Sequence, residues 1–201
     1  YNRGIFLQNL ERPEQAADAY ETAIRLDPDH VLARVNVSLV YAGLSHRAAE
    51  VGKAERVVRE YAAKAERVLR EALRIAPANA AANFNFGLLL SELGRLPEAE
   101  ACLRQALKTD PNFPEAAYNL GVLLAHDRLD EAIVFCGKAA ELRPGDPKYA
   151  YTLAFFLHRK GELEAARTAL ERLIDQHPEY ADAYRLLDAV EQDIIRRDVK
   201  D

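Results

Sequence analysis

Apolar residues recur along most of the chain at spacings of three and four, with polar and charged residues between them. One such segment follows Pro13 and places Ala16, Tyr20 and Ala23 on one side. This spacing matches the turn of an α-helix and predicts an amphipathic helix with one buried face. Pro13 suits the first turn of that helix, where a missing N–H costs nothing. The helix ends before Pro28, because the residue preceding a proline is driven out of the helical region.

The same segments return with a period near 34 residues. Five copies carry small residues and a proline at matching positions: Gly4, Ala16, Ala23, Pro28; Ser38, Ala65, Ala72, Pro77; Gly87, Ala99, Ala106, Pro111; Gly121, Ala132, Ala139, Pro144; and Ala154, Ala166, Leu173, Pro178. The prolines stand 49, 34, 33 and 34 residues apart. Small residues let two helices approach closely while larger neighbours fill the grooves, so each period predicts a packed pair of helices.

This pattern resembles the tetratricopeptide repeat, and its copies are similar to the bacterial consensus of that family. The resemblance covers nearly the whole chain. It implies an all-α fold: an α-solenoid of helix–turn–helix repeats in a right-handed superhelix, with the first helices lining a concave groove. It also implies a single solenoid domain over residues 1–201, because the units of a solenoid contact only their neighbours. The expected repeats span residues 1–30, 31–79, 80–113, 114–146 and 147–180, followed by a capping helix over 181–198.

Both ends of the expected solenoid depart from a regular repeat. Only three residues precede Gly4, where the family pattern has seven, so we expect a first helix that is cut short. The last segment carries Tyr184, Leu187, Val190 and Ile194 at helical spacing and is charged elsewhere. We expect this segment to cover the apolar edge of the last repeat.

The second repeat contains fifteen extra residues. Part of them is a duplication, because residues 53–60 recur as 64–71 with seven identities in eight. The copies stand eleven residues apart, about three helical turns, so the duplication lengthens a helix without rotating its buried face. We therefore expect one long helix from about Ser45 to Ala76, whose first half projects from the solenoid. In the alternative, Gly52 marks the turn of the pair, and the first helix is the lengthened one.

The composition argues against two classes of function. A net charge of -5 and a pI near 5.6 argue against a general nucleic-acid binder, which carries a basic stripe or a high pI. No apolar run approaches the roughly 18 residues of a membrane helix, so we expect no membrane insertion. The compartment stays open between cytoplasm and periplasm.

Residues that could carry chemistry are few. The five histidines are scattered along the chain, and none has the spacing of a metal ligand pair. Cys102 and Cys136 stand one repeat apart, and we expect them to fill buried apolar positions. The sequence contains no phosphate loop, nucleophile elbow or catalytic cysteine motif. We therefore expect no metal, no cofactor and no enzymatic activity.

An asparagine lies two residues before the glycine-like position in most repeats, as in Asn36, Asn85 and Asn119. In O-linked N-acetylglucosamine transferase, which has a related superhelix, such asparagines form a ladder that holds the backbone of an extended peptide. An amide suits this task because it offers a donor and an acceptor to every peptide unit. The asparagines are also part of the generic repeat consensus, so a purely inherited scaffold stays open as an alternative.

Aromatic residues accompany the asparagines, with Phe84, Tyr118 and Tyr151 at equivalent positions and Phe155 one turn beyond Tyr151. Aromatic side chains supply much contact area at low entropic cost and often anchor interfaces. Basic residues near the C-terminal end of the groove are expected to favour acidic residues of a partner. The expected binding residues are Asn36, Asn85, Asn119, Phe84, Tyr118, Tyr151, Phe155, Lys148 and Arg185, with Arg159 beside them.

A more specific activity of the family fits poorly. Its chaperone cofactors clamp a C-terminal carboxylate with two lysines, two asparagines and an arginine. Asn119 and Lys148 match this set, but Phe84, Leu88 and Thr152 occupy the other three positions. We therefore expect no carboxylate clamp of this kind in the groove.

Three functions stay open. The first is a scaffold that binds a peptide or protein segment in the groove. The second is a self-assembly module, because the expected long helix would expose Val51, Ala54 and Val58, and the N-terminal edge would expose the first helix pair. The third, a docking arm of a larger protein such as an enzyme, rests on analogy alone.

Overall fold

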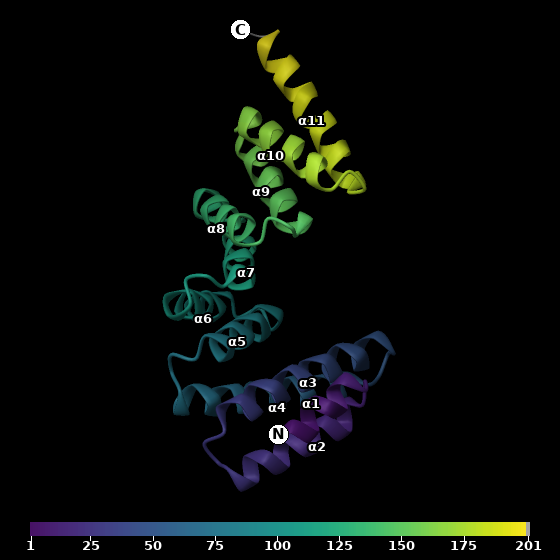
Figure 1. The fold of residues 1–201 in the computed structure, drawn as a ribbon, viewed down its shortest axis with the longest axis vertical. Helices are drawn as coiled ribbons and strands as arrows, with labels where there is room; N and C mark the ends of the chain where they lie inside the picture. The colour runs from purple at the N-terminus through teal and green to yellow at the C-terminus, as the bar shows by residue number, and fades with distance from the viewer. Residues whose placement is uncertain (200–201) are drawn as a thin grey trace. The chain divides into compact units, whose positions relative to one another are not determined.

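The computed structural model describes residues 1–199, and this part of the chain forms eleven helices and no strand (Figure 1). The chain divides into two compact units, Tyr1–Pro111 and Asn112–Asp201. Within each unit every helix packs against its neighbours in sequence. The expected all-α solenoid of helix pairs is confirmed.

Unit 1 consists of three helix pairs. They are α1 (Asn2–Asn9) with α2 (Pro13–Leu26), α3 (Val31–Glu50) with α4 (Glu55–Ile75), and α5 (Ala80–Glu92) with α6 (Leu96–Thr109). Where the second pair meets α5, Val35, Ala72 and Ala82 form one buried cluster. The second pair and α5 therefore share a buried apolar contact.

Unit 2 consists of two pairs and a final single helix. These are α7 (Pro114–Leu124) with α8 (Leu129–Leu142), α9 (Pro147–Lys160) with α10 (Leu163–Gln176), and α11 (Ala181–Asp198). The inner face of α11 contributes Ala183, Val190 and Ile194 to a buried cluster with residues of α9 and α10. The expected capping helix is confirmed, because α11 covers the apolar side of the last pair.

The helices begin where their sequences satisfy the free N–H groups of the first turn. Pro114 and Pro147 open α7 and α9, where their missing N–H is not needed. Before α5, the Asn79 side chain accepts the Ala82 N–H at 2.8 Å. Before α9, the Asp146 carboxylate accepts the Lys148 N–H at 3.1 Å. These caps fix the start of the two helices by local chemistry.

The paired helices approach closely at three glycines, Gly4, Gly87 and Gly121. A Cβ atom on Gly121 would lie 2.5 Å from Cys136 Sγ and 3.0 Å from the Ala132 carbonyl oxygen. A Cβ atom on Gly87 would lie 2.9 Å from a carbon of Leu103. The expectation that small residues bring these helices together is therefore confirmed.

The expected single helix from Ser45 to Ala76 is wrong. The chain turns at residues 51–54, between α3 and α4. Gly52 lies there with φ of 65°, a left-handed conformation that suits glycine because it has no Cβ. The N–H groups of Gly52 and Lys53 bond the carbonyls of Ala49 and Ala48 at 3.0 and 2.9 Å, which closes α3 with a Schellman motif. The alternative is correct in placing the turn at Gly52, but both helices of the pair, not the first alone, are lengthened.

The fifteen extra residues lengthen both helices of this pair. Helices α3 and α4 contain 20 and 21 residues, against 13 and 14 in α5 and α6. Each helix is therefore about two turns longer, which keeps its buried face in register. The extensions pack on each other, with the Tyr41 and Tyr61 rings stacked at 6.4 Å and Ser45 Oγ donating to the Val58 carbonyl at 3.0 Å.

The expected assembly surface on a projecting helix over residues 45–76 is not formed. Val58 is half-buried against α3, and only Val51 and Ala54 in the turn are exposed. A second helix pairs with the extension over its length, so no long apolar helix face projects from the fold.

The close approach at Gly121 generates a stability prediction. Gly121→Ala should destabilise the protein by about 1–3 kcal/mol, because the new methyl group overpacks the contact with Cys136 and the Ala132 backbone. Gly137 lies inside α8, and a Cβ atom there meets only Leu153 Cδ1 at 3.8 Å. Gly137→Ala should therefore stabilise the protein by about 0.5–1 kcal/mol through helix propensity.

Urea denaturation followed by circular dichroism measures both changes. Shifts of the same sign in the two variants would contradict the assignment of Gly121 to a tight helix contact.

Candidate functional site

Six of the nine expected binding residues belong to unit 2. They are Tyr118 and Asn119 of α7, Lys148, Tyr151 and Phe155 of α9, and Arg185 of α11. The other three, Asn36, Phe84 and Asn85, belong to α3 and α5 of unit 1. The two groups are described separately below.

The contacts between α7 and α9 centre on Tyr118. Its ring lies 5.1 Å from the ring of Tyr149, and the Lys148 ammonium lies 4.2 Å from its centroid. The second distance is that of a cation–π interaction, which holds the lysine over the ring. Burial is the main cause that raises the pKa of the Tyr149 hydroxyl, with the nearby Glu115 carboxylate next. Tyr149 therefore supports Tyr118 from the interior, while Lys148 lies exposed above it.

A second aromatic pair continues this surface. The rings of Tyr151 in α9 and Tyr180, just before α11, lie 5.6 Å apart. Burial raises the pKa of the Tyr180 hydroxyl, and the fields of Asp182, Tyr151 and Tyr118 add to this effect. Lys148, Tyr149 and Tyr151 all belong to the first turns of α9, so both aromatic pairs meet that end of the helix. We call Tyr118, Lys148, Tyr149, Tyr151 and Tyr180 the tyrosine surface.

Some of the charged groups near the tyrosine surface form ion pairs, and one does not. Arg185 donates to Asp182 at 3.0 Å, and Arg143 lies 2.6 Å from Glu115. Lys148 has no carboxylate partner within the described part of the chain. Its ammonium is therefore the available positive charge at the centre of the surface.

The remaining residues of α9 extend along the same helix. Phe155 is exposed, and its ring lies 5.8 Å from that of Phe156. His158 bonds Asp193 of α11 at 2.9 Å, and this bond is the main cause of a lowered pKa of the Asp193 carboxyl. Arg159 is exposed. The His158 bond ties α11 to α9 beside Phe155.

The three asparagines lie in different environments. The Asn119 amide nitrogen donates to the Glu115 carbonyl of its own helix at 2.7 Å. The Asn36 amide nitrogen donates to the hydroxyls of Tyr1 and Tyr20 at 3.2 and 3.5 Å. Asn85 is half-buried and makes no side-chain hydrogen bond to any residue from 1 to 199. Each of the three therefore keeps its amide oxygen as an acceptor.

In unit 1, Phe84 is half-buried on α5. A second stacked site in this unit joins Lys64 to the rings of Tyr41 and Tyr61, at 5.7 and 5.5 Å. The sequence reasoning missed this site, and it also missed Tyr149 and Tyr180. For Tyr149 a signal was present, since it stands between two expected binding residues, Lys148 and Tyr151.

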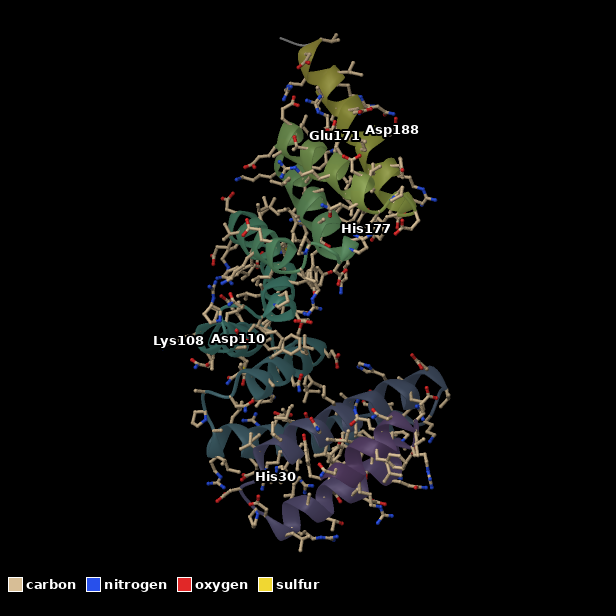
Figure 2. The ribbon with its side chains drawn as sticks, in the orientation of Figure 1. His30, Lys108, Asp110, Glu171, His177 and Asp188 are labelled. Atoms are coloured by element: carbon tan, nitrogen blue, oxygen red, sulfur yellow. The ribbon has the colours of Figure 1, made fainter. Side chains whose placement is uncertain are left out.

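Both cysteines lie within helices, and His30 and His177 lie next to helix ends. Cys136 is buried against Gly121, and burial raises the pKa of its thiol to about 12. Cys102 is half-buried. His30 begins α3, where its Nδ1 accepts the Ala33 N–H at 3.3 Å, and His177 follows α10 (Figure 2). The expectation of buried fillers is confirmed for Cys136, and Cys102 is only partly covered.

Between residues 1 and 199, no group of three His, Cys, Asp or Glu side chains could hold a metal ion. No helix in that range is long and apolar enough to cross a membrane.

Family models described as tetratricopeptide repeats match the chain at residues 1–30, 84–147 and 123–190. No curated protein matches the chain. The matched ranges include α1 and α2, α5 from Phe84 onward, and all the helices from α6 to α10.

Several solved structures are similar to the chain. PilF of Pseudomonas aeruginosa has a TM-score of 0.77 at 21% identity, over 98% of this chain and 83% of that one. MamA (41-end) of Desulfovibrio magneticus has a TM-score of 0.69 at 19% identity, over 89% and 93%. YrrB, described as a TPR protein with an unusual peptide-binding site, has a TM-score of 0.66 at 25% identity, over 92% and 88%.

Proposed function

The chain belongs to the tetratricopeptide repeat family, and on that premise we propose that it is a scaffold that binds a peptide segment of a partner protein on the tyrosine surface of unit 2. The fold is one that generally serves as a protein-interaction scaffold. YrrB, one of the similar structures, is described as having a peptide-binding site. The proposal assigns no chemical reaction to the chain.

The observation that carries the proposal is the stacked pair Tyr118 and Lys148. A half-buried ring with a lysine held 4.2 Å above it offers both apolar area and a positive charge. Tyrosine is among the residues that contribute most binding energy at protein interfaces, because it buries a large rigid surface at low entropic cost. The adjacent pair Tyr151 and Tyr180 extends this area along α9.

The charges favour a partner segment that contains acidic residues. Lys148 has no carboxylate partner in the described chain, so a carboxylate of a peptide can pair with it without displacing an existing bond. Arg159 and Arg185 are also exposed, although Arg185 already pairs with Asp182. An acidic side chain next to an aromatic or aliphatic one would satisfy both parts of the surface.

Asparagines are proposed to hold the peptide backbone. The Asn119 amide oxygen is open to a peptide N–H, since only the nitrogen of that amide is used within α7. Within unit 1, Asn85 keeps both its donors and its acceptor for the backbone of a separate segment that binds that unit alone. Asn36 is the weakest of the three for this role, because its amide nitrogen already bonds two tyrosine hydroxyls.

Peptide selection tests the proposal. We expect a random 12-residue display library, panned on the wild-type chain, to yield peptides that contain acidic and aromatic residues. Lys148→Ala and Tyr151→Ala should each weaken the binding of a selected peptide about tenfold or more, because both truncate central contacts. Fluorescence anisotropy measures the dissociation constants.

The matched controls are Lys64→Ala and Tyr61→Ala, which disrupt the equivalent lysine–tyrosine stack in unit 1. These should leave the affinity unchanged. Loss of affinity in the unit 1 variants, with unit 2 variants binding as wild type, would refute the proposal.

Self-association is a second candidate function, favoured by exposed apolar residues on α1. Phe6 is 62% exposed and Leu10, just after the helix, is 49% exposed. Residues four apart lie on one side of a helix, so the two side chains form an apolar strip. A second copy of the chain could cover this strip.

Light scattering over a tenfold concentration range tests this candidate. Self-association through α1 predicts a wild-type mass that rises with concentration, and a Phe6→Ser/Leu10→Ser variant that stays monomeric. Val51→Ser, in the exposed turn between α3 and α4, is the control and should behave as wild type. A monomeric wild type at every concentration would exclude this candidate.

A further inference from the structure

Arg34 of α3 is a buried charge without a partner. The residue is 8% exposed, and its Nη1 atom is fully buried with no hydrogen-bond acceptor among residues 1–199. Nor does its guanidinium form an ion pair with any carboxylate in that range. An arginine side chain stays protonated in proteins, and burying an unpaired charge is costly. Without a ligand, the unpaired charge therefore destabilises the folded chain, and a bound anion would remove this destabilisation.

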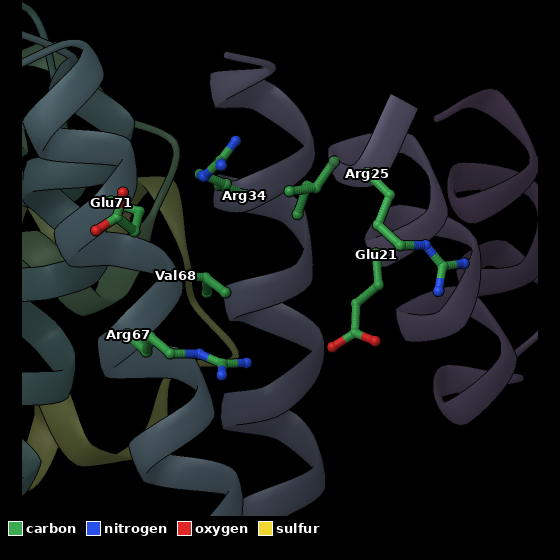
Figure 3. Close-up of a pocket in the computed structure, with 7 residues that line it drawn as sticks. Glu21, Arg25, Arg34, Arg67, Val68 and Glu71 are labelled. Carbon is green, nitrogen blue, oxygen red and sulfur yellow. The ribbon is translucent and has the colours of Figure 1, made fainter. Parts of the chain in front are cut away.

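Arg34 lines a pocket between α2, α3 and α4, entirely within unit 1 (Figure 3). The pocket has a volume of about 330 Å³, within the range of about 300–1,000 Å³ that is typical of small-molecule sites. Figure 3 shows Arg34 on one wall and Arg67, Val68 and Glu71 on the wall formed by α4. The lining residues are Glu21, Ile24, Arg25, Arg34, Arg67, Val68 and Glu71.

The two carboxylates in the pocket are engaged elsewhere. Glu21 accepts a hydrogen bond from the Tyr41 hydroxyl, and Glu71 accepts one from Arg74 at 3.0 Å. Within the described chain, neither forms an ion pair with Arg34. The guanidinium of Arg34 is thus left for a ligand.

The arginines outnumber these carboxylates by one. Arg25 donates to the Thr22 hydroxyl at 2.8 Å rather than to a carboxylate. Arg67, like Arg34, has no ion-pair partner among residues 1–199. The pocket therefore carries one net positive charge, which suits a ligand with a single negative charge.

We propose that this pocket binds a carboxylate carried on a short apolar group, with the Arg34 guanidinium as its anchor. The planar fork of a guanidinium matches the two oxygens of a carboxylate. Ile24 and Val68 give the pocket an apolar wall for the rest of the ligand. A doubly charged phosphate suits the site less well, because the carboxylates of Glu21 and Glu71 would repel the second charge. The site lies in unit 1 and does not depend on the tyrosine surface.

Calorimetry with simple ligands tests the proposal. The probes are 3-methylbutanoate, the neutral 3-methylbutan-1-ol of nearly the same shape, and inorganic phosphate. We expect saturable binding of 3-methylbutanoate to the wild-type chain, and weaker binding of the alcohol and of phosphate. Arg34→Met should weaken the binding of 3-methylbutanoate about tenfold or more, because it removes the charged hydrogen bonds.

Arg59→Met is the matched control, since Arg59 lies exposed on α4 and pairs only with Glu55. It should bind 3-methylbutanoate as the wild type does. The proposal would be overturned by absence of saturable binding, by equal binding to wild type and Arg34→Met, or by tighter binding of phosphate than of the carboxylate.

A stability measurement tests the same proposal without a ligand. Removal of an unpaired buried charge should raise the urea midpoint of unfolding of Arg34→Met above that of the wild type. Added 3-methylbutanoate should raise the midpoint of the wild type but not that of the variant. A lower midpoint for Arg34→Met without ligand would show that the guanidinium stabilises the fold, and would overturn the assignment.

Discussion

The fold depends on the close contact between the two helices of each pair. Where the helices meet, Gly87 faces Leu103 and Gly121 faces Cys136, at distances that leave no room for a methyl group. Dispersion and burial of apolar area both fall steeply with separation, so this contact provides much of the stability that a pair can have. A solenoid has no central core to compensate for a loose pair, because each unit contacts only its neighbours. The size of a few side chains therefore determines whether the repeats pack at all.

This constraint also determines which residues are left for binding. Where glycine faces glycine-sized space, as at Gly87 and Gly121, the partner residues are alanine, cysteine and leucine. The half-buried rings of Tyr118 and Tyr151 lie on the tyrosine surface of unit 2. In unit 1 the lengthened pair α3 and α4 accommodates bulkier and more polar residues. There the stack of Tyr41, Tyr61 and Lys64 covers the extension, and Arg34 lies buried beside a pocket. Both units thus carry a lysine–tyrosine stack, and unit 1 adds a buried guanidinium.

Local patterns predicted the helix pairs well, because the spacing of small and apolar residues acts within one or two turns. The break at Gly52 was only an alternative, since the apolar spacing of residues 51–75 fits one long helix as well as two. The packing of α4 along α3 favours two helices over one, and this contact between distant residues cannot be read from local sequence patterns. Glu11 shows the same limit: it adopts φ of 54° at a turn equivalent to that of Gly94, although its residue type gives no sign of it.

In the candidate site, Tyr118 and Lys148 followed from repeat positions. Tyr180 did not, because it lies in a loop that only the docking of α11 brings to Tyr151. Arg34 had a signal that was missed, a charged residue in the apolar run from Val31 to Val37.

The central claim is that the tyrosine surface of unit 2 contacts the partner segment. Nuclear magnetic resonance of the chain with isotope-labelled tyrosine rings, titrated with a peptide selected by the wild type, tests it most directly. The account predicts that the ring signals of Tyr118, Tyr151 and Tyr180 shift with a common dissociation constant, while those of Tyr41 and Tyr61 stay in place. Shifts confined to Tyr41 and Tyr61, with the signals of unit 2 unchanged, would contradict it.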